Sequence, residues 1–268
     1  MPLLAVVTGG AQGLGAGIAE VLAENGVVVA LVDIQREKLM EVRKKIIESG
    51  GQASAHVANV SNINSAKTLG SEIVLDHGTP DILVNNAGVL YFQDFLEGLS
   101  MNHYDCVLSA LFQGDTESWA HMINTNIVGY LNTISVFLPM MKKNKKGHII
   151  NIGSSNSRDP AAGMAVYSGT KSFWLGMTPA LRKEVRGTGI KITQVEPGAV
   201  RTEGVMKVMQ NPTFEAVHEK FYPRSTEKID KDFVHHKMIP RDIGEVVWDA
   251  IRTVDRVYEQ DIYVGNRE

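Results

Sequence analysis

Short runs of apolar, mostly β-branched residues alternate with longer segments of helical spacing along most of the chain. Apolar runs without polar alternation are typical of parallel strands that are buried on both faces of a sheet. We expect strands at Leu3–Thr8, Val27–Val32, Ile82–Asn85, His148–Ile152 and Ile190–Val195, with a weaker strand at Gln52–Val57 and a last one at Asp261–Val264. The helical spacing predicts helices at Gly15–Asn25, Arg36–Ser49, Ile63–His77, Thr116–Lys143 and Ala165–Arg186, and one that begins near Pro240.

The regular exchange of strand and helix predicts the fold class. βαβ units connect through right-handed crossovers and place helices on both faces of a parallel sheet. We therefore expect an α/β protein with a doubly wound, Rossmann-like parallel sheet, in a single domain over residues 1–268. Glycines follow four of the expected helices as C-terminal caps do; they are Gly26, Gly50, Gly78 and Gly147.

Two stretches break this alternation, at about residues 89–115 and 203–237. Both follow strands at the carboxyl edge of the expected sheet, where open α/β folds bind ligands. Loops of this length inside a compact domain are usually lids or binding loops. Because they are rich in aromatic residues and methionine, we interpret them as substrate-binding loops for a substrate with apolar area. A plain surface excursion is the alternative.

A glycine cluster follows the first expected strand, at Gly9, Gly13 and Gly15. Glycine lets the chain turn sharply and bring backbone N–H groups against a pyrophosphate, which the dipole of the following helix stabilises. Asp33 lies 20 positions after Gly13, where a carboxylate can bond the adenosine ribose hydroxyls and repel a 2′-phosphate. Gln12 places no basic side chain there, so the sequence favours NAD(H). Arg36 is close enough to keep NADP(H) as the less favoured alternative.

Four ordered motifs resemble those of the short-chain dehydrogenase/reductase family: TGGAQGLG from Thr8, NNAG from Asn85, Tyr-x-x-x-Lys from Tyr167 and PGAVRT from Pro197. The resemblance covers essentially the whole chain. It implies an oxidoreductase that interconverts a secondary alcohol and a carbonyl compound by hydride transfer with a nicotinamide cofactor. The cofactor contacts that it implies are Gly9, Gln12, Gly13, Leu14, Gly15, Asp33, Ile34, Asn59, Val60, Asn86, Ala87, Gly88, Tyr167, Lys171, Pro197, Gly198, Val200 and Thr202.

Tyr167 and Lys171 are the expected proton-transfer pair. Four positions apart, they share one face of a helix, so the ammonium can lie near the phenol. A free tyrosine has a pKa of about 10, too high for a good base at neutral pH, but a nearby cation favours the phenolate. The spacing therefore predicts an acid/base group, with a surface i,i+4 contact as the alternative for any isolated pair of this kind.

Two further catalytic residues follow from the resemblance. Ser154, 13 positions before Tyr167, matches the family's catalytic serine, whose hydroxyl orients the substrate oxygen. Asn126 matches the helix asparagine that kinks its helix and holds a water in a proton relay to the lysine. If the register shifts, Ser155 or Ser157 is the alternative to Ser154, and Asn124 is the alternative to Asn126.

Two features depart from the family's pattern. Asn59 stands where the family usually has an acid that receives the adenine amino group, and its side-chain oxygen can still accept that bond. Residues 100–111 look inserted, which leaves the identity of the alcohol or ketone substrate open. No metal site is assigned from the sequence.

Charge and composition exclude several partner classes. The chain carries 27 basic and 30 acidic residues, so no basic excess is present to bind nucleic acid. The longest apolar runs are far below the roughly 20 residues that span a bilayer, so no membrane segment is expected. Cys106 is the only cysteine, which fits a reducing cytoplasmic location. The resemblance implies a homodimer or homotetramer, with the helices from Thr116 and Ala165 at the interface.

One rival function comes from another class of protein, a dinucleotide-binding regulator that kept the fold and lost catalysis. Such a protein would be expected to lose the Tyr–Lys pair, which is intact here. An epimerase or dehydratase on the same fold usually has a longer chain with a separate substrate region.

Overall fold

The computed structural model describes residues 2–91, 116–209, 238–253 and 260–265. These residues form one seven-stranded sheet in the order β3-β2-β1-β4-β5-β6-β7, in which all neighbouring strands are parallel. The strands are β1 Leu4–Thr8, β2 Val28–Asp33, β3 Gln52–Val57, β4 Ile82–Asn85, β5 Gly147–Ile152, β6 Ile190–Pro197 and β7 Asp261–Val264. The predicted doubly wound parallel sheet is confirmed, and the direction of winding reverses between β1 and β4.

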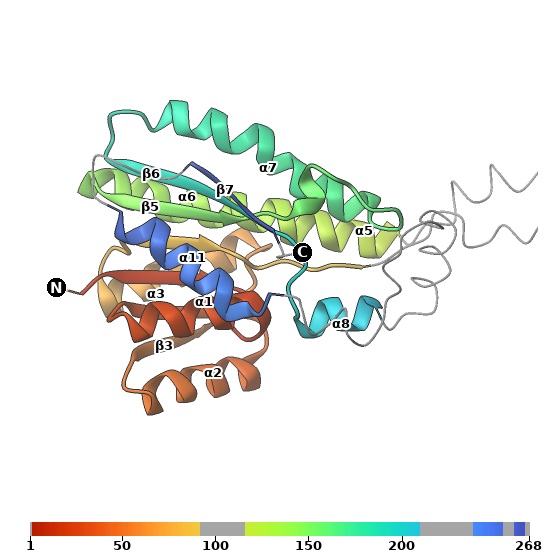
Figure 1. The fold of residues 1–268 in the computed structure, drawn as a ribbon. Helices are drawn as coiled ribbons and strands as arrows, with labels where there is room; N and C mark the ends of the chain where they lie inside the picture. The colour runs from red at the N-terminus through yellow and green to blue at the C-terminus, as the bar shows by residue number, and fades with distance from the viewer. Residues whose placement is uncertain (1, 92–115, 210–237, 254–259, 266–268) are drawn as a thin grey trace, which may run out of the picture.

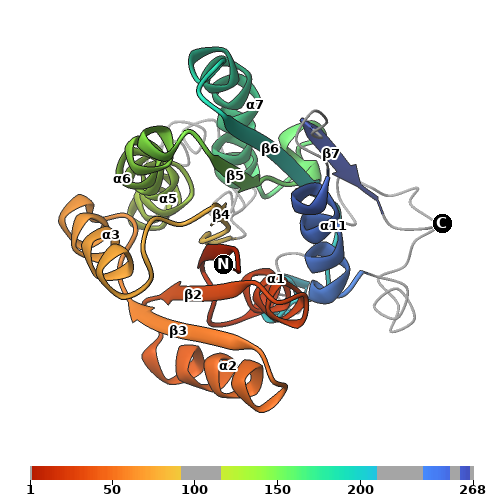
Figure 2. The ribbon, with the colours of Figure 1, turned by 90° about the vertical axis from the view of Figure 1, so that its left-hand side faces the viewer.

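Helices cover both faces of the sheet (Figures 1 and 2). One face carries α1 Gly13–Glu24, α2 Arg36–Glu48 and α11 Pro240–Arg252, and the other carries α3 Ile63–His77, α6 Gly129–Asn144 and α7 Ala165–Glu184. Each layer buries its own apolar cluster against the sheet, with Ile18 and Leu39 in one and Phe137 and Trp174 in the other. The apolar strands are therefore buried on both faces, as their sequences predict.

Helices α1 and α11 meet at two glycines. A Cβ atom on Gly17 would lie 2.6 Å from the Cβ of Pro240, and one on Gly244 would lie 2.8 Å from the carbonyl oxygen of Gly17. Only glycine permits so close an approach of the two backbones. This contact holds α11, which comes late in the chain, against the first helix.

The predicted helix Thr116–Lys143 is not continuous. It consists of α5 Thr116–Ile123, a π-helical turn at Asn124–Val128 and then α6. A π turn inserts one extra residue into the helical ladder and redirects the side chains around it, and such turns are frequent at functional sites. The π turn lies at the place where the family resemblance implies a kink.

Three of the four predicted glycine caps have a positive φ, which favours glycine: Gly26 at φ 80, Gly50 at φ 86 and Gly78 at φ 87. The prediction for Gly147 is wrong, because Lys145 takes the left-handed conformation at φ 53 instead. Gly147 begins β5, where a Cβ atom would lie 2.7 Å from Met141 Sδ, so close packing is the reason for this glycine. Among the described residues, no helix is long and apolar enough to cross a bilayer.

Candidate active site

The glycine-rich turn joins β1 to α1 at the carboxyl edge of the sheet. Gly9 and Gly13 both have positive φ, 67 and 56, a backbone that other residues rarely adopt. A Cβ atom on Gly15 would collide with the carbonyl oxygen of Gly9. The turn is thus closed tightly on itself at the start of α1, which begins at Gly13, two residues before the predicted start. Exposed backbone at a helix N-terminus fits the pyrophosphate of a dinucleotide.

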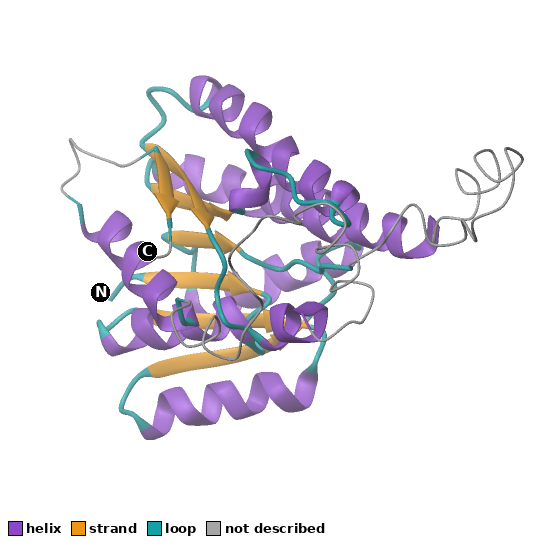
Figure 3. Cartoon of the chain, turned by 45° about the vertical axis from the view of Figure 1, so that its right-hand side comes forward, coloured by secondary structure: helices purple, strands orange, loops and turns teal. Residues whose placement is uncertain are grey.

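The segment after β4 is tied directly to this turn. The Thr8 hydroxyl accepts hydrogen bonds from the backbone N–H of Asn86 at 3.0 Å and of Ala87 at 3.1 Å. In return, Asn86 Nδ2 donates to the carbonyl oxygens of Thr8 at 2.9 Å and Gly9 at 3.2 Å. These bonds join the ends of β1 and β4, where the winding of the sheet reverses and open α/β folds bind their ligands. Figure 3 shows the loops that continue from the strands on this side.

Asp33 lies at the end of β2 and is held in place from both sides. Its carboxylate accepts hydrogen bonds from the backbone N–H of Ala11 at 3.2 Å and of Gln35 at 3.0 Å. The following Ile34 exposes 61% of its surface. A fixed carboxylate next to an exposed apolar side chain fits the ribose and the adenine ring of a dinucleotide.

Gln12 is itself uncharged, as the sequence analysis notes, but a basic side chain from α2 lies beside it. Lys38, one turn into α2, places its Nζ 2.6 Å from Gln12 Oε1 and 3.1 Å from Glu203 Oε2. Spacing along the chain favours Arg36 as the basic residue near this site. The way α2 follows β2 instead directs Lys38 toward the glycine turn.

The segment after β6 reaches the same turn. Thr202 lies directly before α8 Glu203–Met209, and a Cβ atom on Gly13 would be 3.6 Å from Thr202 Cγ2. The Gly198 N–H donates to the carbonyl oxygen of Val264 in β7 at 2.7 Å, and Val200 forms an isolated bridge with Met238. The structure therefore brings Thr202, at the end of this segment, next to Gly13 of the glycine turn.

Asn59 and Val60 follow β3 and lie in different environments, Asn59 exposed and Val60 buried. Asn59 is exposed, and its Oδ1 accepts from Ser61 N at 3.0 Å and Ser61 Oγ at 2.6 Å. An adenine amino group could use this oxygen only if Ser61 moved. Val60 is buried beneath Gly129, at which a Cβ atom would lie 2.9 Å from Val60 Cγ2.

Tyr167, Ser154 and Lys171 converge beside the end of β5. Ser154 lies close enough to Tyr167 to influence its pKa, and its hydroxyl accepts from Asn156 N at 3.2 Å. Lys171 Nζ lies 5.9 Å from the centre of the Tyr167 ring and donates to the carbonyl oxygen of Ile152 at 2.9 Å. The three residues come from the β5–η2 junction and from one face of α7, so the predicted set is assembled.

The neighbouring serines do not take the place of Ser154. Ser157 is buried and its hydroxyl donates to the Ser154 carbonyl oxygen, while Ser155 begins the short 3-10 helix η2 Ser155–Ser157. Ser154 is therefore the member of this group that reaches Tyr167.

Burial controls the protonation of the site. Burial raises the pKa of the Tyr167 phenol above its ordinary value, and the hydrogen bond with Ser154 acts in the opposite direction. Burial also lowers the pKa of Lys171 to about 8. The sequence predicts that a nearby cation lowers the pKa of Tyr167, but in the structure this pKa is raised, because desolvation disfavours charge on both groups.

Asn126 is buried in the π turn, whereas Asn124 is exposed. Its side chain exchanges hydrogen bonds with the backbone of Val89, donating to the carbonyl oxygen at 2.9 Å and accepting from the N–H at 2.8 Å. It also donates to Thr170 Oγ1 at 3.1 Å, and that hydroxyl donates to the Tyr167 carbonyl oxygen at 2.7 Å. Asn126 thus links the segment after β4 to the helix that carries Tyr167.

Trp174 and Thr170 complete this link, and the sequence analysis missed both. The Trp174 indole donates to the backbone carbonyl oxygen of Asn126 at 3.0 Å, and Trp174 is fully buried. Their positions on α7, three and seven residues after Tyr167, are the only sequence signal, and it does not distinguish them from ordinary core residues.

A buried polar chain runs beneath the site through asparagines of the otherwise mostly apolar strands β4 and β5. Asn85 Nδ2 donates to Asn151 Oδ1 at 3.0 Å, and Asn151 Nδ2 donates to Thr178 Oγ1 at 3.3 Å. The Thr133 hydroxyl donates to Asn85 Oδ1 at 2.6 Å. These bonds tie β4 and β5 to α6 and α7, because buried amides require partners.

Most of the two predicted substrate loops, residues 92–115 and 210–237, lies outside the described residues, as does the apparent insertion at 100–111. The described ends are Tyr91, whose hydroxyl pairs with His121 Nδ1 at 2.9 Å, and α8. In Figure 1, α5 and α8 both lie on the side of the carboxyl ends of the strands.

Comparisons with known proteins agree with this geometry. The family model for short chain dehydrogenase matches residues 3–213. An uncharacterised oxidoreductase of Staphylococcus saprophyticus is 36% identical over 201 residues, which cover 74% of this chain and 79% of that protein. A serine dehydrogenase complexed with NADP+ superposes with a TM-score of 0.77 at 26% identity, covering 98% of this chain and 94% of the other. A metagenomic short-chain oxidoreductase in complex with NADP has a TM-score of 0.72 at 26% identity, covering 98% and 96%. The chain therefore belongs to the short-chain dehydrogenase family of NAD(P)-binding oxidoreductases.

Proposed function

We propose that this protein is an NAD(H)-dependent alcohol dehydrogenase or carbonyl reductase that interconverts a secondary alcohol and a ketone. The observation that carries the proposal is the contact of Tyr167 with Ser154 while Lys171 lies 5.9 Å from its ring. This arrangement places a proton donor, a hydrogen-bond donor and a cation around one point at the carboxyl edge of the sheet.

The residues divide the work as follows. A bound nicotinamide supplies the hydride in reduction and accepts it in oxidation. The Ser154 hydroxyl holds the substrate oxygen and stabilises charge on it. Tyr167 donates its phenolic proton to that oxygen in reduction and removes the proton from the alcohol in oxidation. The Lys171 ammonium stabilises the phenolate that reduction leaves behind, and Asn126 positions α7 through Thr170.

The raised pKa of Tyr167 gives the two directions different pH dependences. Reduction needs the phenol and has it at neutral pH. Oxidation needs the phenolate, so its rate should rise as the pH becomes alkaline.

A panel of ketones and aldehydes with cyclic, aryl and short polar members tests the function. NADH oxidation, followed by the absorbance of reduced nicotinamide, should occur with at least one ketone that carries apolar area. The corresponding alcohol should be oxidised faster at alkaline than at neutral pH. Cofactor binding without turnover of any panel member would support the regulator instead.

The preference for NAD(H) rests on Asp33. Wild-type protein should show a higher kcat/KM with NADH than with NADPH, because the fixed carboxylate repels a 2′-phosphate. Asp33→Asn should lower the ratio of kcat/KM with NADH to kcat/KM with NADPH by about tenfold. A hydrogen bond to a charged group is worth about 1.5–3 kcal/mol, and 1.4 kcal/mol is a factor of ten. Lys38→Met should raise this NADH-to-NADPH ratio, because Lys38 Nζ is the cation beside Gln12 that would attract a 2′-phosphate.

Asp249→Asn is the matched control, since Asp249 pairs with Arg252 on the exposed side of α11 and should leave the ratio unchanged. A wild-type preference for NADPH would contradict the assignment and would identify Lys38 as a 2′-phosphate ligand.

For assembly and location, we infer a homodimer or homotetramer in the cytoplasm. The helices α5 and α7 expose Ile123 and Phe173, at 43% and 38%, which supports their place in a subunit interface. A single cysteine supports a reducing compartment.

A further inference from the structure

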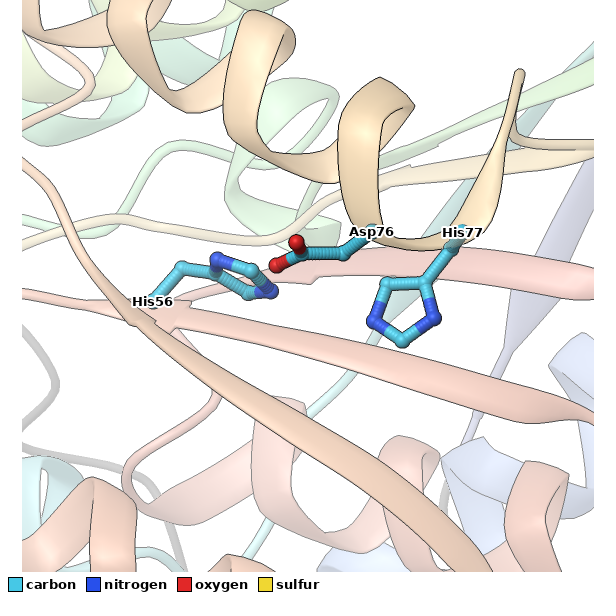
Figure 4. A group of neighbouring side chains, drawn as sticks. All are labelled: His56, Asp76 and His77. Carbon is cyan, nitrogen blue, oxygen red and sulfur yellow. The ribbon is translucent and has the colours of Figure 1, made fainter.

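Two histidines and two acids gather between the edge strand β3 and the last turns of α3. His56 comes from β3, and Asp76 and His77 end α3 (Figure 4). One ligand atom from each of these three side chains lies within 4.8 Å of the others. Glu72, one turn before Asp76 on α3, lies with its Oε2 3.8 Å from His56 Nδ1. β3 is at the edge of the sheet, whereas Tyr167 lies on α7, which packs against β6.

Hydrogen bonds already aim the two imidazoles at one point. Ser54 Oγ lies 2.9 Å from His56 Nε2 and 3.0 Å from His77 Nε2. One hydroxyl hydrogen cannot satisfy two unprotonated ring nitrogens, so one histidine must donate its own proton to Ser54. Both Nε2 atoms therefore lie around the same point, where one cation can accept a lone pair from each.

The other side of His56 is also suited to metal binding. Ligating histidines usually turn their second ring nitrogen to a carboxylate, which fixes the tautomer. Glu72 lies at Nδ1 of His56, so Nε2 is the nitrogen that faces His77. Glu72 and Asp76 supply the negative charge.

We propose that His56, Asp76 and His77 form a binding site for a divalent transition metal, with zinc as the best match, and that Glu72 orients His56 from outside the ligand set. Two imidazoles and one carboxylate suit Zn2+ better than Mg2+ or Ca2+, which prefer oxygen ligands alone. The bound ion would join the edge strand to the end of α3. His56 and His77 are far apart in sequence, which is why no motif revealed them.

The direct test is titration of tag-free, EDTA-treated and desalted protein with Zn2+ alone by isothermal calorimetry. We expect one ion per chain from this site and a higher melting temperature in Zn2+ than in EDTA. His77→Gln should weaken binding at least about tenfold, because even outer partners of metal ligands contribute about 10–100-fold in affinity. Asp76→Asn should weaken it in the same direction.

Two controls keep the result specific. His77 and Asp76 are exposed, so their variants should melt in EDTA at the wild-type temperature, which separates lost ligands from lost fold. The second imidazole pair in the sequence, His235 and His236, lies outside the described residues, and H235Q/H236Q should bind zinc as wild type does. The proposal is overturned if His77→Gln binds zinc as tightly as wild type, or if binding is lost only in H235Q/H236Q.

Discussion

Tyr167→Phe should lower kcat by about 10²- to 10⁴-fold, the range that a positioned acid or base contributes. The variant keeps the ring, which lies near Lys171, and removes only the hydroxyl that Ser154 contacts. Hydride transfer to a ketone then leaves charge on the substrate oxygen with no phenol to protonate it. Both directions of the reaction should slow, because the same group gives and takes the proton.

Cofactor affinity separates this role from a structural one. Fluorescence titration with NADH should give a dissociation constant within about twofold of wild type. Tyr263→Phe is the matched control, because Tyr263 is 62% exposed on β7 and should not change kcat. If Tyr167→Phe bound NADH and turned over at nearly the wild-type rate, the proposal that Tyr167 transfers the proton would be wrong.

Lys171→Met should lose activity and at the same time stabilise the cofactor-free protein. Activity should fall by at least about 10²-fold, because the cation that stabilises the phenolate is gone. Stability should rise because Lys171 is 4% exposed and its ammonium is disfavoured by burial. The Ile152 carbonyl oxygen keeps a partner, since the Tyr130 hydroxyl also donates to it at 3.1 Å.

The size of this gain in stability, and the pH range over which it is expected, follow from the pKa of Lys171, which burial lowers from 10.5 to about 8. At about 1.4 kcal/mol per pH unit, the cost of folding a charged Lys171 is of order 3 kcal/mol. Below pH 8 this cost is present in full. Between pH 8 and 10.5 the unfolded chain binds more protons than the folded one, so the free energy of unfolding of wild type rises with pH.

Urea unfolding of both proteins at pH 7 and pH 10 measures this. Lys171→Met should be more stable at pH 7, and the difference should shrink by pH 10. Lys67→Met, at an exposed position of α3, should change neither activity nor stability. If Lys171→Met were less stable than wild type at pH 7, burial of the charged Lys171 side chain would not destabilise the fold.

Local patterns predicted most of the elements and identified the residues that we propose as the catalytic set. All seven strands and their parallel arrangement follow from apolar runs separated by helical segments, because period and length are properties of neighbouring residues. Tyr167 and Lys171 share a helix face for the same reason, and motif order identified Ser154 and Asn126. The π turn at Asn124–Val128 has no periodic signal of its own, so the sequence predicted one long helix there.

Contacts between distant segments produced the departures. Lys38 reaches Gln12 because α2 folds back beside the glycine turn, and spacing along the chain favoured Arg36 instead. Lys145 rather than Gly147 takes the left-handed conformation at the end of α6, whereas Gly147 is glycine because a Cβ atom there would lie 2.7 Å from Met141 Sδ.

By itself, the sequence determined the doubly wound sheet, the glycine turn with Asp33 and the order of the proposed catalytic residues, since these depend on backbone geometry and fixed spacing. Only the tertiary structure decided the protonation of Tyr167 and Lys171, the partners of Asn126, and the meeting of His56 with His77. Each of these depends on which groups exclude water from one another, and burial is a property of the packed chain rather than of any local pattern.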